Sequence, residues 1–259
     1  MITLLTDFGS QDYFVPAVKG VILALHPQAT IVDLTHNISS QDIRAAAFTI
    51  GACYQTFPAG TIHLGVVDPG VGSSRRAIVV EARHQFFVGP DNGLFSFVYA
   101  REKKVRVFHA SRQEYFRHPI SPTFHGRDVF APLAAWLQKG VVTEDLGKQI
   151  EDYERIVLPT PRLAGDHVEG EIIQVDQFGN CITNLTSSEL PLREVTGSTH
   201  LRIAEREVRQ FGTHFAQFLK ANELLAYLGS AGFWEIALWQ DSAAKKFQIG
   251  CGTVVRLRR

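Results

Sequence analysis

Three polar segments of the chain hold residue types that bind and transform charged small molecules. Residues 6–12 contain two carboxylates, residues 68–76 contain an aspartate and two arginines among glycines, and residues 122–128 contain a histidine, an arginine and an aspartate. Carboxylates and arginines can hold charged groups, and a histidine can take up or release a proton near neutral pH. Asp, Gly and Ser also fill turns and helix N-caps, so any one segment could be an ordinary loop.

The elements around these segments predict that the segments meet. Apolar strands at Ile2–Leu5, Thr30–Leu34 and Thr61–Val67 alternate with helices that end near Leu25 and Tyr54. This alternation is typical of a parallel sheet covered by helices on both faces, whose ligands bind beyond the C-terminal ends of the strands. The first two polar segments follow such strands, and the third precedes the last helix. We therefore expect one site at this edge of the sheet.

The remaining elements of this half make the sheet mixed. Ala77–Ala82 and Gln85–Val88 are strands separated only by two residues, which predicts a hairpin. A last helix is expected over Gly126–Gln138. The expected N-cap residues of the first two helices are Asp12 and either Ser39 or Ser40.

The composition of the chain changes near Pro159 and Pro161, which predicts a linker. We expect an α/β N-terminal domain over residues 1–160, with a mostly parallel, mixed sheet flanked by helices. Short strands separated by turn residues predict a small C-terminal antiparallel β-barrel domain, or a sandwich, over residues 161–259. The strands expected there are Val168–Asp176, Cys181–Leu185, His200–Ile203, Leu224–Leu228, Trp234–Trp239 and Gly250–Leu257.

One further polar segment, residues 176–184, lies in the second half. Phe178 could stack on a flat ring, and Asn180 could pair with a base edge or a hydroxyl group. A plain strand–turn–strand would use the same residues, with one buried ring and two turn residues, so both interpretations stay open.

Composition excludes several classes of protein. The 26 Lys and Arg balance 26 Asp and Glu, which argues against a nucleic-acid partner. No apolar run is long enough to span a membrane, so we expect no membrane partner. Cys53, Cys181 and Cys251 form no disulfide framework, and the N-terminus lacks the basic start of a signal peptide. A cytoplasmic location is expected.

Several better-known motifs do not fit. Asp7-Phe8-Gly9 and His125-Gly126-Arg127-Asp128 share letters with kinase motifs, but their order is reversed and no glycine-rich nucleotide loop precedes them. Gly70-Val71-Gly72 matches neither the dinucleotide fingerprint nor the Walker loop. No HExxH motif occurs and the histidines lack ligand spacing, so no metal site is predicted.

Taken together, the polar segments resemble a known family. The sequence is similar to the S-adenosyl-L-methionine (SAM) hydroxide adenosyltransferases, which are adenosine-forming SAM hydrolases related to fluorinases and chlorinases. The motifs that carry the resemblance run in family order through both halves of the chain. They are Thr6-Asp7-Phe8-Gly9, Val67–Gly72 with Arg75-Arg76, Gly89–Leu94, Thr123–Asp128, Phe178-Gly179-Asn180 and Gly229–Gly232.

The resemblance implies that water or hydroxide attacks C5′ of SAM and that methionine leaves. It places a catalytic trio at Asp68, Arg75 and His125. The further substrate contacts that it implies are Asp7 on the ribose, Asp12, Asp176 and Ser230 at the methionine end, Asn180 and the backbone around Glu235–Leu238 near the adenine, Phe124 and Phe178 as apolar walls, and Phe233. It also implies a homotrimer with sites at subunit interfaces, SAM as the substrate and no cofactor.

The halogenases carry an insertion before their counterpart of residues 90–94, and this chain has none. They also carry a Tyr at the position of Asp68 and a Ser at the position of Gly126. In this chain an anion therefore stands near the place of a halide and the serine hydroxyl is missing, and both differences favour water as the nucleophile. Two alternatives remain: a slow halide-using SAM adenosyltransferase, and a non-catalytic module that binds adenosine or SAM.

Overall fold

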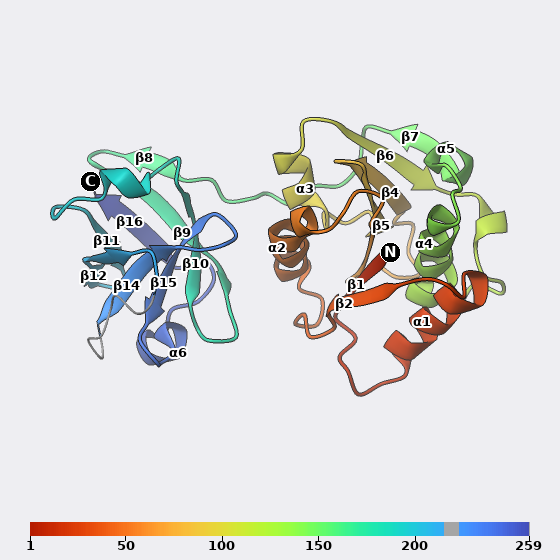
Figure 1. The fold of residues 1–259 in the computed structure, drawn as a ribbon, viewed down its shortest axis with the longest axis horizontal. Coiled ribbons are helices and arrows are strands. Elements are labelled where there is room, and N and C mark those ends of the chain that lie inside the picture. The colour runs from red at the N-terminus through yellow and green to blue at the C-terminus, as the bar shows by residue number, and fades with distance from the viewer. Residues whose placement is uncertain (215–222, 259) are drawn as a thin grey trace. The chain divides into compact units, whose positions relative to one another are not determined.

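The structure, a computed structural model, describes residues 1–214 and 223–258. The chain divides into two compact units, Met1–Val157 and Leu158–Arg259 (Figure 1). The change of unit lies slightly before the prolines at 159 and 161. Among the described residues, no helix is both long and apolar enough to cross a membrane.

A mixed sheet forms the centre of the N-terminal unit, in the strand order β2-β1-β3-β5-β4-β6-β7. The first four strands of this order run parallel, and the pairs β5–β4, β4–β6 and β6–β7 are antiparallel. The predicted mixed sheet is therefore confirmed, including its hairpin. The strands are β1 Ile2–Thr6, β2 Ile31–Thr35, β3 Ile62–Val66, β4 Ala77–Ala82, β5 Gln85–Pro90, β6 Val105–Ala110 and β7 Gly147–Ile150.

Helices cover both faces of this sheet. Successive side chains of a strand point to opposite faces, so Leu4 packs with α1 and α4, whereas Leu5 packs with α2 and α3. Both side chains are fully buried. The helices are α1 Phe14–Leu25, α2 Ile43–Cys53, α3 Ser96–Arg101, α4 Ala131–Gln138 and α5 Thr143–Leu146, with a π-helical turn at Gly126–Phe130 and 3-10 turns at Tyr54–Thr56 and Gln113–Tyr115.

The predicted helix starts were wrong. No side chain caps α1, and Asp12 lies in an exposed bend before it. The Asp42 carboxylate caps α2 by accepting a hydrogen bond from Ala45 N at 2.9 Å. An N-cap side chain bonds the amide two or three residues later, and Ser39 and Ser40 lie too far upstream for this.

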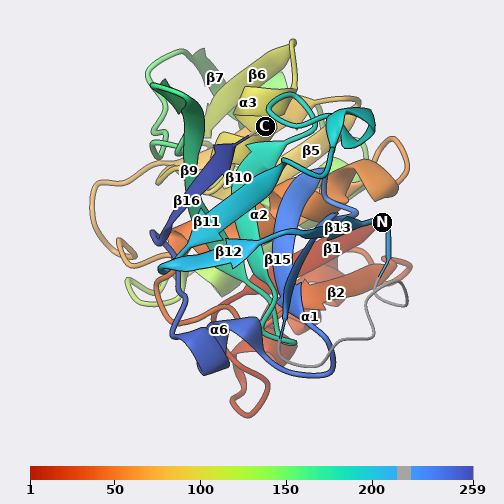
Figure 2. The same ribbon diagram turned by 90° about the vertical axis from the view of Figure 1, so that its left-hand side faces the viewer.

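A nearly closed, barrel-like sheet forms the C-terminal unit (Figure 2). Its strand order is β12-β11-β16-β9-β10-β15-β14-β13, with β8 paired to β9. The described pairs are antiparallel except β13–β14, which is parallel. The strands are β8 Arg162–Ala164, β9 His167–Val175, β10 Cys181–Thr186, β11 His200–Ile203, β12 Arg206–Val208, β13 Gln210–Gly212, β14 Leu224–Leu228, β15 Phe233–Leu238 and β16 Val254–Arg258.

The core of this unit lies inside the curved sheet. Trp234 and Ile236 on β15 point into it with Cys181, and all three are fully buried. The described residues of this unit also form the 3-10 turn Leu192–Glu194 and the short helix α6, Ala243–Phe247. Ser242 caps α6 by accepting from Lys245 N at 3.1 Å. These elements fix the turns on which the C-terminal candidate site residues lie.

Candidate active site

Asp68 and Arg75 form a bidentate ion pair. Arg75 Nε donates to Asp68 Oδ1 at 2.8 Å, and Arg75 Nη2 donates to Asp68 Oδ2. The two side chains are only 6% and 10% exposed, and the guanidinium lies over the ring of Phe130. Two parallel hydrogen bonds fix both groups in one plane, so the carboxylate has a defined direction.

His125 joins this pair through the arginine. Arg75 Nη2 lies 2.9 Å from His125 Nδ1. A guanidinium can only donate hydrogen bonds, so Nδ1 accepts and the imidazole is neutral, with its proton on Nε2. Burial and the positive charge of Arg75 lower the pKa of His125, in agreement with the neutral form. The structure therefore brings together the three residues predicted as the trio.

A close backbone contact allows the trio to form. Asp68 and Arg75 lie in the loop between β3 and β4, and His125 directly precedes the π-helical turn. Gly72, in this loop, has a φ of +78°, and a Cβ atom there would collide with the carbonyl oxygen of Pro122. Glycine is the residue that adopts this φ and lacks the colliding atom. The two segments can therefore touch.

Hydrogen bonds to the Asp128 carboxylate fix the segment around His125. Its side chain is fully buried and accepts hydrogen bonds from Arg117, Arg127 and Ser121 N at 2.7–2.9 Å. Arg127 also lies over the ring of Phe124. A buried carboxylate needs such partners, and here they fasten the chain on both sides of His125.

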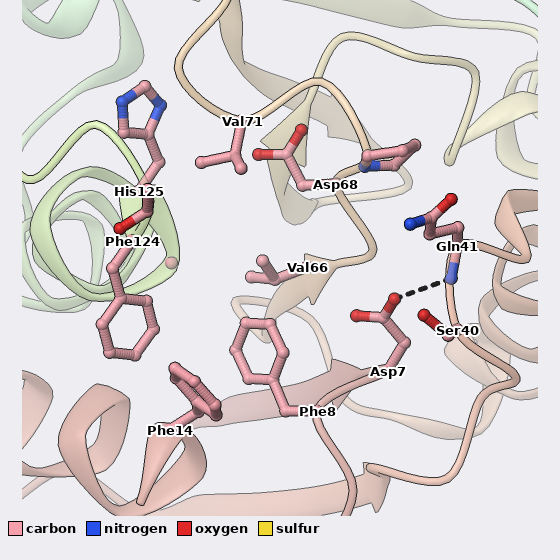
Figure 3. Close-up of a pocket in the computed structure, with 13 residues that line it drawn as sticks. Asp7, Phe8, Phe14, Ser40, Gln41, Val66, Asp68, Val71, Phe124 and His125 are labelled. Atoms are coloured by element: carbon pink, nitrogen blue, oxygen red, sulfur yellow. Dashed lines mark hydrogen bonds between the residues drawn. The ribbon is translucent and has the colours of Figure 1, made fainter.

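A pocket of about 390 Å³ lies where β1 and β3 end (Figure 3). Asp7, Asp68 and His125 line it. Asp7 Oδ2 accepts a hydrogen bond from Gln41 N at 2.8 Å, and Gln41 adopts an unusual φ of +65° that turns its amide toward Asp7. The polar groups lie where ligands of open α/β sheets bind.

Aromatic rings form the opposite side of this pocket. Figure 3 shows Phe8, Phe14 and Phe124 gathered on the side away from Asp7. Phe14 and Phe124 meet edge to face, with ring centroids 5.2 Å apart. The pocket thus offers an apolar wall facing carboxylates. The lining residues that were not predicted as substrate contacts are Phe8, Phe14, Ser40, Gln41, Val66, Pro69, Val71, Thr123 and Gly126. Of these, Phe8, Pro69, Val71, Thr123 and Gly126 lie inside the motifs that carry the family resemblance.

The C-terminal unit carries a separate recess of about 470 Å³. Phe178, Asn180 and Leu238 line it, together with Trp239 and Gln240, which were not predicted. Phe178 is 79% exposed, so it is not the buried ring of a plain turn. Asp176 shapes the turn by accepting from Phe178 N, from Asn180 N and from Asn180 Nδ2.

Other predicted residues lie outside the two recesses. Asp12 and Ser230 are exposed and line neither, and Phe233 is half-buried at the start of β15. Glu235 is buried, and the Tyr227 hydroxyl donates a 2.5 Å hydrogen bond to its Oε2. Among the residues described, no group of three His, Cys, Asp or Glu side chains converges to hold a metal ion.

Comparison with known proteins assigns the chain to a family. A sequence profile described as the SAM hydroxide adenosyltransferase N-terminal domain matches residues 2–147, and the profile of the corresponding C-terminal domain matches residues 170–256. The chain belongs to the SAM hydroxide adenosyltransferase family. The resemblance noted in the sequence is thereby confirmed across both units.

Individual relatives match over nearly the whole chain. A protein of Thermus thermophilus named (R)-S-adenosyl-L-methionine hydrolase is 36% identical, over 99% of this chain and 98% of the relative. A fluorinase of Nocardia brasiliensis is 27% identical, over 100% of this chain and 96% of the relative. A solved structure described as an uncharacterized conserved protein from Thermotoga maritima is 34% identical, covers both chains completely and has a TM-score of 0.92.

Proposed function

We propose that this protein hydrolyses SAM to adenosine and L-methionine. The observation that carries the proposal is the contact of Asp68, Arg75 and His125 beside a pocket at the ends of β1 and β3. Relatives named SAM hydrolase that are 31–36% identical support the same activity.

The departure of the leaving group needs no catalytic assistance. An oxygen of water forms a bond to C5′, while the C5′–S bond breaks and its electron pair stays on sulfur. The sulfonium thereby becomes a neutral thioether, so no general acid is needed. The difficulty lies with the nucleophile, because water has a pKa of about 15.7 and a carboxylate with a pKa of about 3.9 is a weak base toward it.

Asp68 and Arg75 would activate the water by orienting it and by stabilising the negative charge that develops on its oxygen. Each Asp68 oxygen has a second lone pair after bonding Arg75, so Asp68 can accept a hydrogen bond from water and aim it at C5′. The Arg75 cation stabilises developing hydroxide, and more strongly in a poorly solvated pocket. His125 Nδ1 is occupied by Arg75, which makes His125 the group that orients the arginine. The proton leaves through Asp68 to solvent.

The polar and apolar residues of the two recesses suit different parts of SAM. Asp7 would bind the ribose hydroxyls, and Phe124 would pack on the apolar part of the nucleoside. The recess with Phe178, Asn180 and Leu238 would take the adenine. The methionine end would meet Asp12, Asp176 and Ser230. No cofactor is required by this mechanism.

We also propose a homotrimer in which the N-terminal pocket of one chain works with the C-terminal recess of a neighbouring chain. The two recesses lie in different compact units, and each carries only part of the expected contacts. Mixing an Asp68→Asn chain with an Asn180→Ala chain under subunit exchange tests this. Partial return of activity is expected; sites built within one chain would give none.

Product analysis tests the activity and separates it from the alternatives. The purified protein is incubated with each sulfonium epimer of SAM, because the relatives are named for the (R) form. Adenosine and methionine are expected, whether or not chloride or fluoride is present. A 5′-halo product would favour the halide-using alternative. Binding of SAM with no product would favour the non-catalytic module.

A further inference from the structure

A recess of about 960 Å³ lies at the edge of the N-terminal sheet where β5 and β6 begin. Phe86 in its wall pairs with Ile62, the first residue of the parallel strand β3. The candidate active site lies at the other end of β3, roughly 15 Å along the strand, so the two sites are separate. The ionisable residues that line the recess are Glu81, Arg83, His84, Arg101, Glu102, Lys103, Lys104 and Arg106.

Cations outnumber acids around this recess, and both acids already have partners. Glu81 pairs with Arg106 and accepts a hydrogen bond from the Thr143 hydroxyl. Glu102 accepts a hydrogen bond from the Tyr54 hydroxyl at 2.6 Å. The chain has no net charge, so the excess of positive charge is local to the recess.

Three of these cations lack a partner within the described part of the chain. No residue of 1–214 or 223–258 forms an ion pair or a hydrogen bond with the side chain of Arg83, Lys103 or Lys104. All three residues are exposed. They come from two separate loops, the β4–β5 turn and the segment between α3 and β6, which converge on the same recess. This convergence suits an anion that carries several charges.

The conformation of the β4–β5 turn is an independent observation. Its two residues, Arg83 and His84, have φ angles of +53° and +59°, between the paired residues Ala82 and Gln85. Two-residue turns of this kind usually contain Asn and Gly, because other residues are strained at positive φ. A hydrogen bond from Gly60 N to His84 O at 2.7 Å holds the turn in place. Residues kept in strained conformations cluster at functional sites, and here one of them is an unpaired cation of the recess.

We propose that this recess binds an oligophosphate, either free or as the phosphate chain of a nucleotide. A guanidinium group binds phosphate oxygens through two parallel hydrogen bonds, and lysines bind phosphate as point charges. A single phosphate is too small to contact both loops of so large a recess. Linked phosphates have the length and the charge to contact Arg83, Lys103 and Lys104 together.

Calorimetric titration of the full chain with tripolyphosphate tests the assignment. The wild-type protein should bind tripolyphosphate more tightly than orthophosphate, and binding should weaken as the salt concentration rises. The double variant Lys103→Ala, Lys104→Ala should raise the dissociation constant at least about tenfold, because it removes charge-assisted hydrogen bonds. Lys148→Ala, Lys245→Ala removes the same charge from exposed positions elsewhere and serves as the matched control, with the dissociation constant nearly unchanged.

The turn provides a second variant that separates binding from folding. Arg83→Asn with His84→Gly introduces the residues that this turn prefers. The melting temperature should therefore rise, while the dissociation constant of tripolyphosphate should also rise. Weaker binding by a more stable protein cannot result from unfolding.

Cytidine triphosphate distinguishes the two sources of the phosphate chain. Tighter binding than that of tripolyphosphate would indicate a nucleotide, and equal or weaker binding would indicate the phosphate chain alone. No binding of tripolyphosphate at about 1 mM, or an equal loss in the two lysine pairs, would overturn the inference. Loss of binding in Arg75→Ala would place the anion in the candidate active site and would also overturn it. The titrations contain no SAM, so their outcome does not depend on the proposed function.

Discussion

The guanidinium of Arg75 contacts two side chains of the candidate site, the Asp68 carboxylate and the His125 imidazole. Its Nη2 atom contacts both Asp68 and His125. Removing either partner would free the guanidinium to turn, since the bidentate geometry needs both hydrogen bonds to Asp68 and the imidazole blocks rotation on the other side. Two predictions at the residue scale follow from these contacts.

The first concerns the acid and the arginine. Asp68→Asn or Arg75→Lys should lower kcat by about 100-fold or more, because each removes oriented charge at the nucleophile. The dissociation constant of SAM, measured by calorimetry, should change little. Wild-type turnover in either variant would show that the trio is assigned incorrectly.

The variant Asp7→Ala should affect SAM binding, in contrast to the two variants that should affect kcat. Ribose hydroxyls keep their contacts throughout the reaction, so loss of Asp7 should weaken SAM binding and raise KM while kcat changes less. An unchanged dissociation constant would contradict a ribose-binding role for Asp7.

The second prediction concerns pH. Because burial and the charge of Arg75 lower the pKa of His125 from its usual 6.5, the imidazole is neutral at pH 7 and gains a proton only as the pH falls below 6.5. Protonation places a hydrogen on Nδ1 against Arg75, so kcat/KM should fall on the acid side of the pH profile. His125→Gln should remove this limb; a limb with the same midpoint in that variant would assign it to another group.

The sequence predicted that Asp68, Arg75 and His125 act together, and the structure shows that they are in contact. Other features of the candidate site depend on backbone conformation. Asp68, Arg75 and His125 stand in motifs whose order along the chain is specific. Gln41 contributes a backbone amide through a positive φ, which a glutamine in the sequence does not indicate. Trp239 and Gln240 line a recess only because the chain turns sharply after β15.

At the scale of elements, helix α2 carries the segment that binds Asp7. Its start depends on Asp42, whose carboxylate bonds Ala45 N. Asp42→Ala should lower the free energy of unfolding by about 1 kcal/mol, the usual cost of losing an N-cap. Urea denaturation would measure this, with Ser39→Ala as the control, for which almost no change is expected. An equal loss in both variants would argue against the assigned cap.

The strands were easier to predict than the helices. Apolar runs mark β1, β3 and β4 clearly, because both faces of this sheet are buried. The short α3 and α6 were missed, since five or six residues give too little periodicity. The regular part of the last helix begins at Ala131 rather than Gly126, because Gly126–Phe130 forms a π-helical turn. Such turns occur often at functional sites, and this one adjoins His125.

At the scale of the whole molecule, a buried histidine links stability to pH. His63 on β3 is 1% exposed, bonds Thr3 Oγ1 at 2.8 Å and stacks on Phe87. Burial lowers the pKa of His63 from 6.5 to about 4. The unfolded chain therefore takes up a proton first, and the contribution of His63 to stability is lost as the pH falls from 6.5 toward 4.

The size of this effect can be measured by replacement. Between pH 7 and pH 5, His63 should account for about 2 kcal/mol of lost stability. The double variant Thr3→Val, His63→Phe removes the titrating group and its partner together. Its free energy of unfolding should fall less than that of the wild type over this interval, by about that amount. Parallel pH dependence of the two proteins would exclude this role of His63.

The neutral balance of the chain also fits its proposed substrate. Equal numbers of acidic and basic residues produce no long-range field to collect a polyanion. SAM needs only a few local charges, and we propose that the Asp68–Arg75 pair and Asp7 supply them. The prolines at 159 and 161 lie just after the division between the two compact units. The parallel β13–β14 pair was not predicted, because its short strands carry no signal of direction.

The proposed reaction is the attack of water on C5′ of SAM. The most direct test incubates the protein with SAM in ¹⁸O-water and weighs the adenosine by mass spectrometry. Attack at C5′ predicts one ¹⁸O atom in the 5′-hydroxyl group of adenosine and none in methionine. Adenosine without the label, or no adenosine from either sulfonium epimer, would contradict the account.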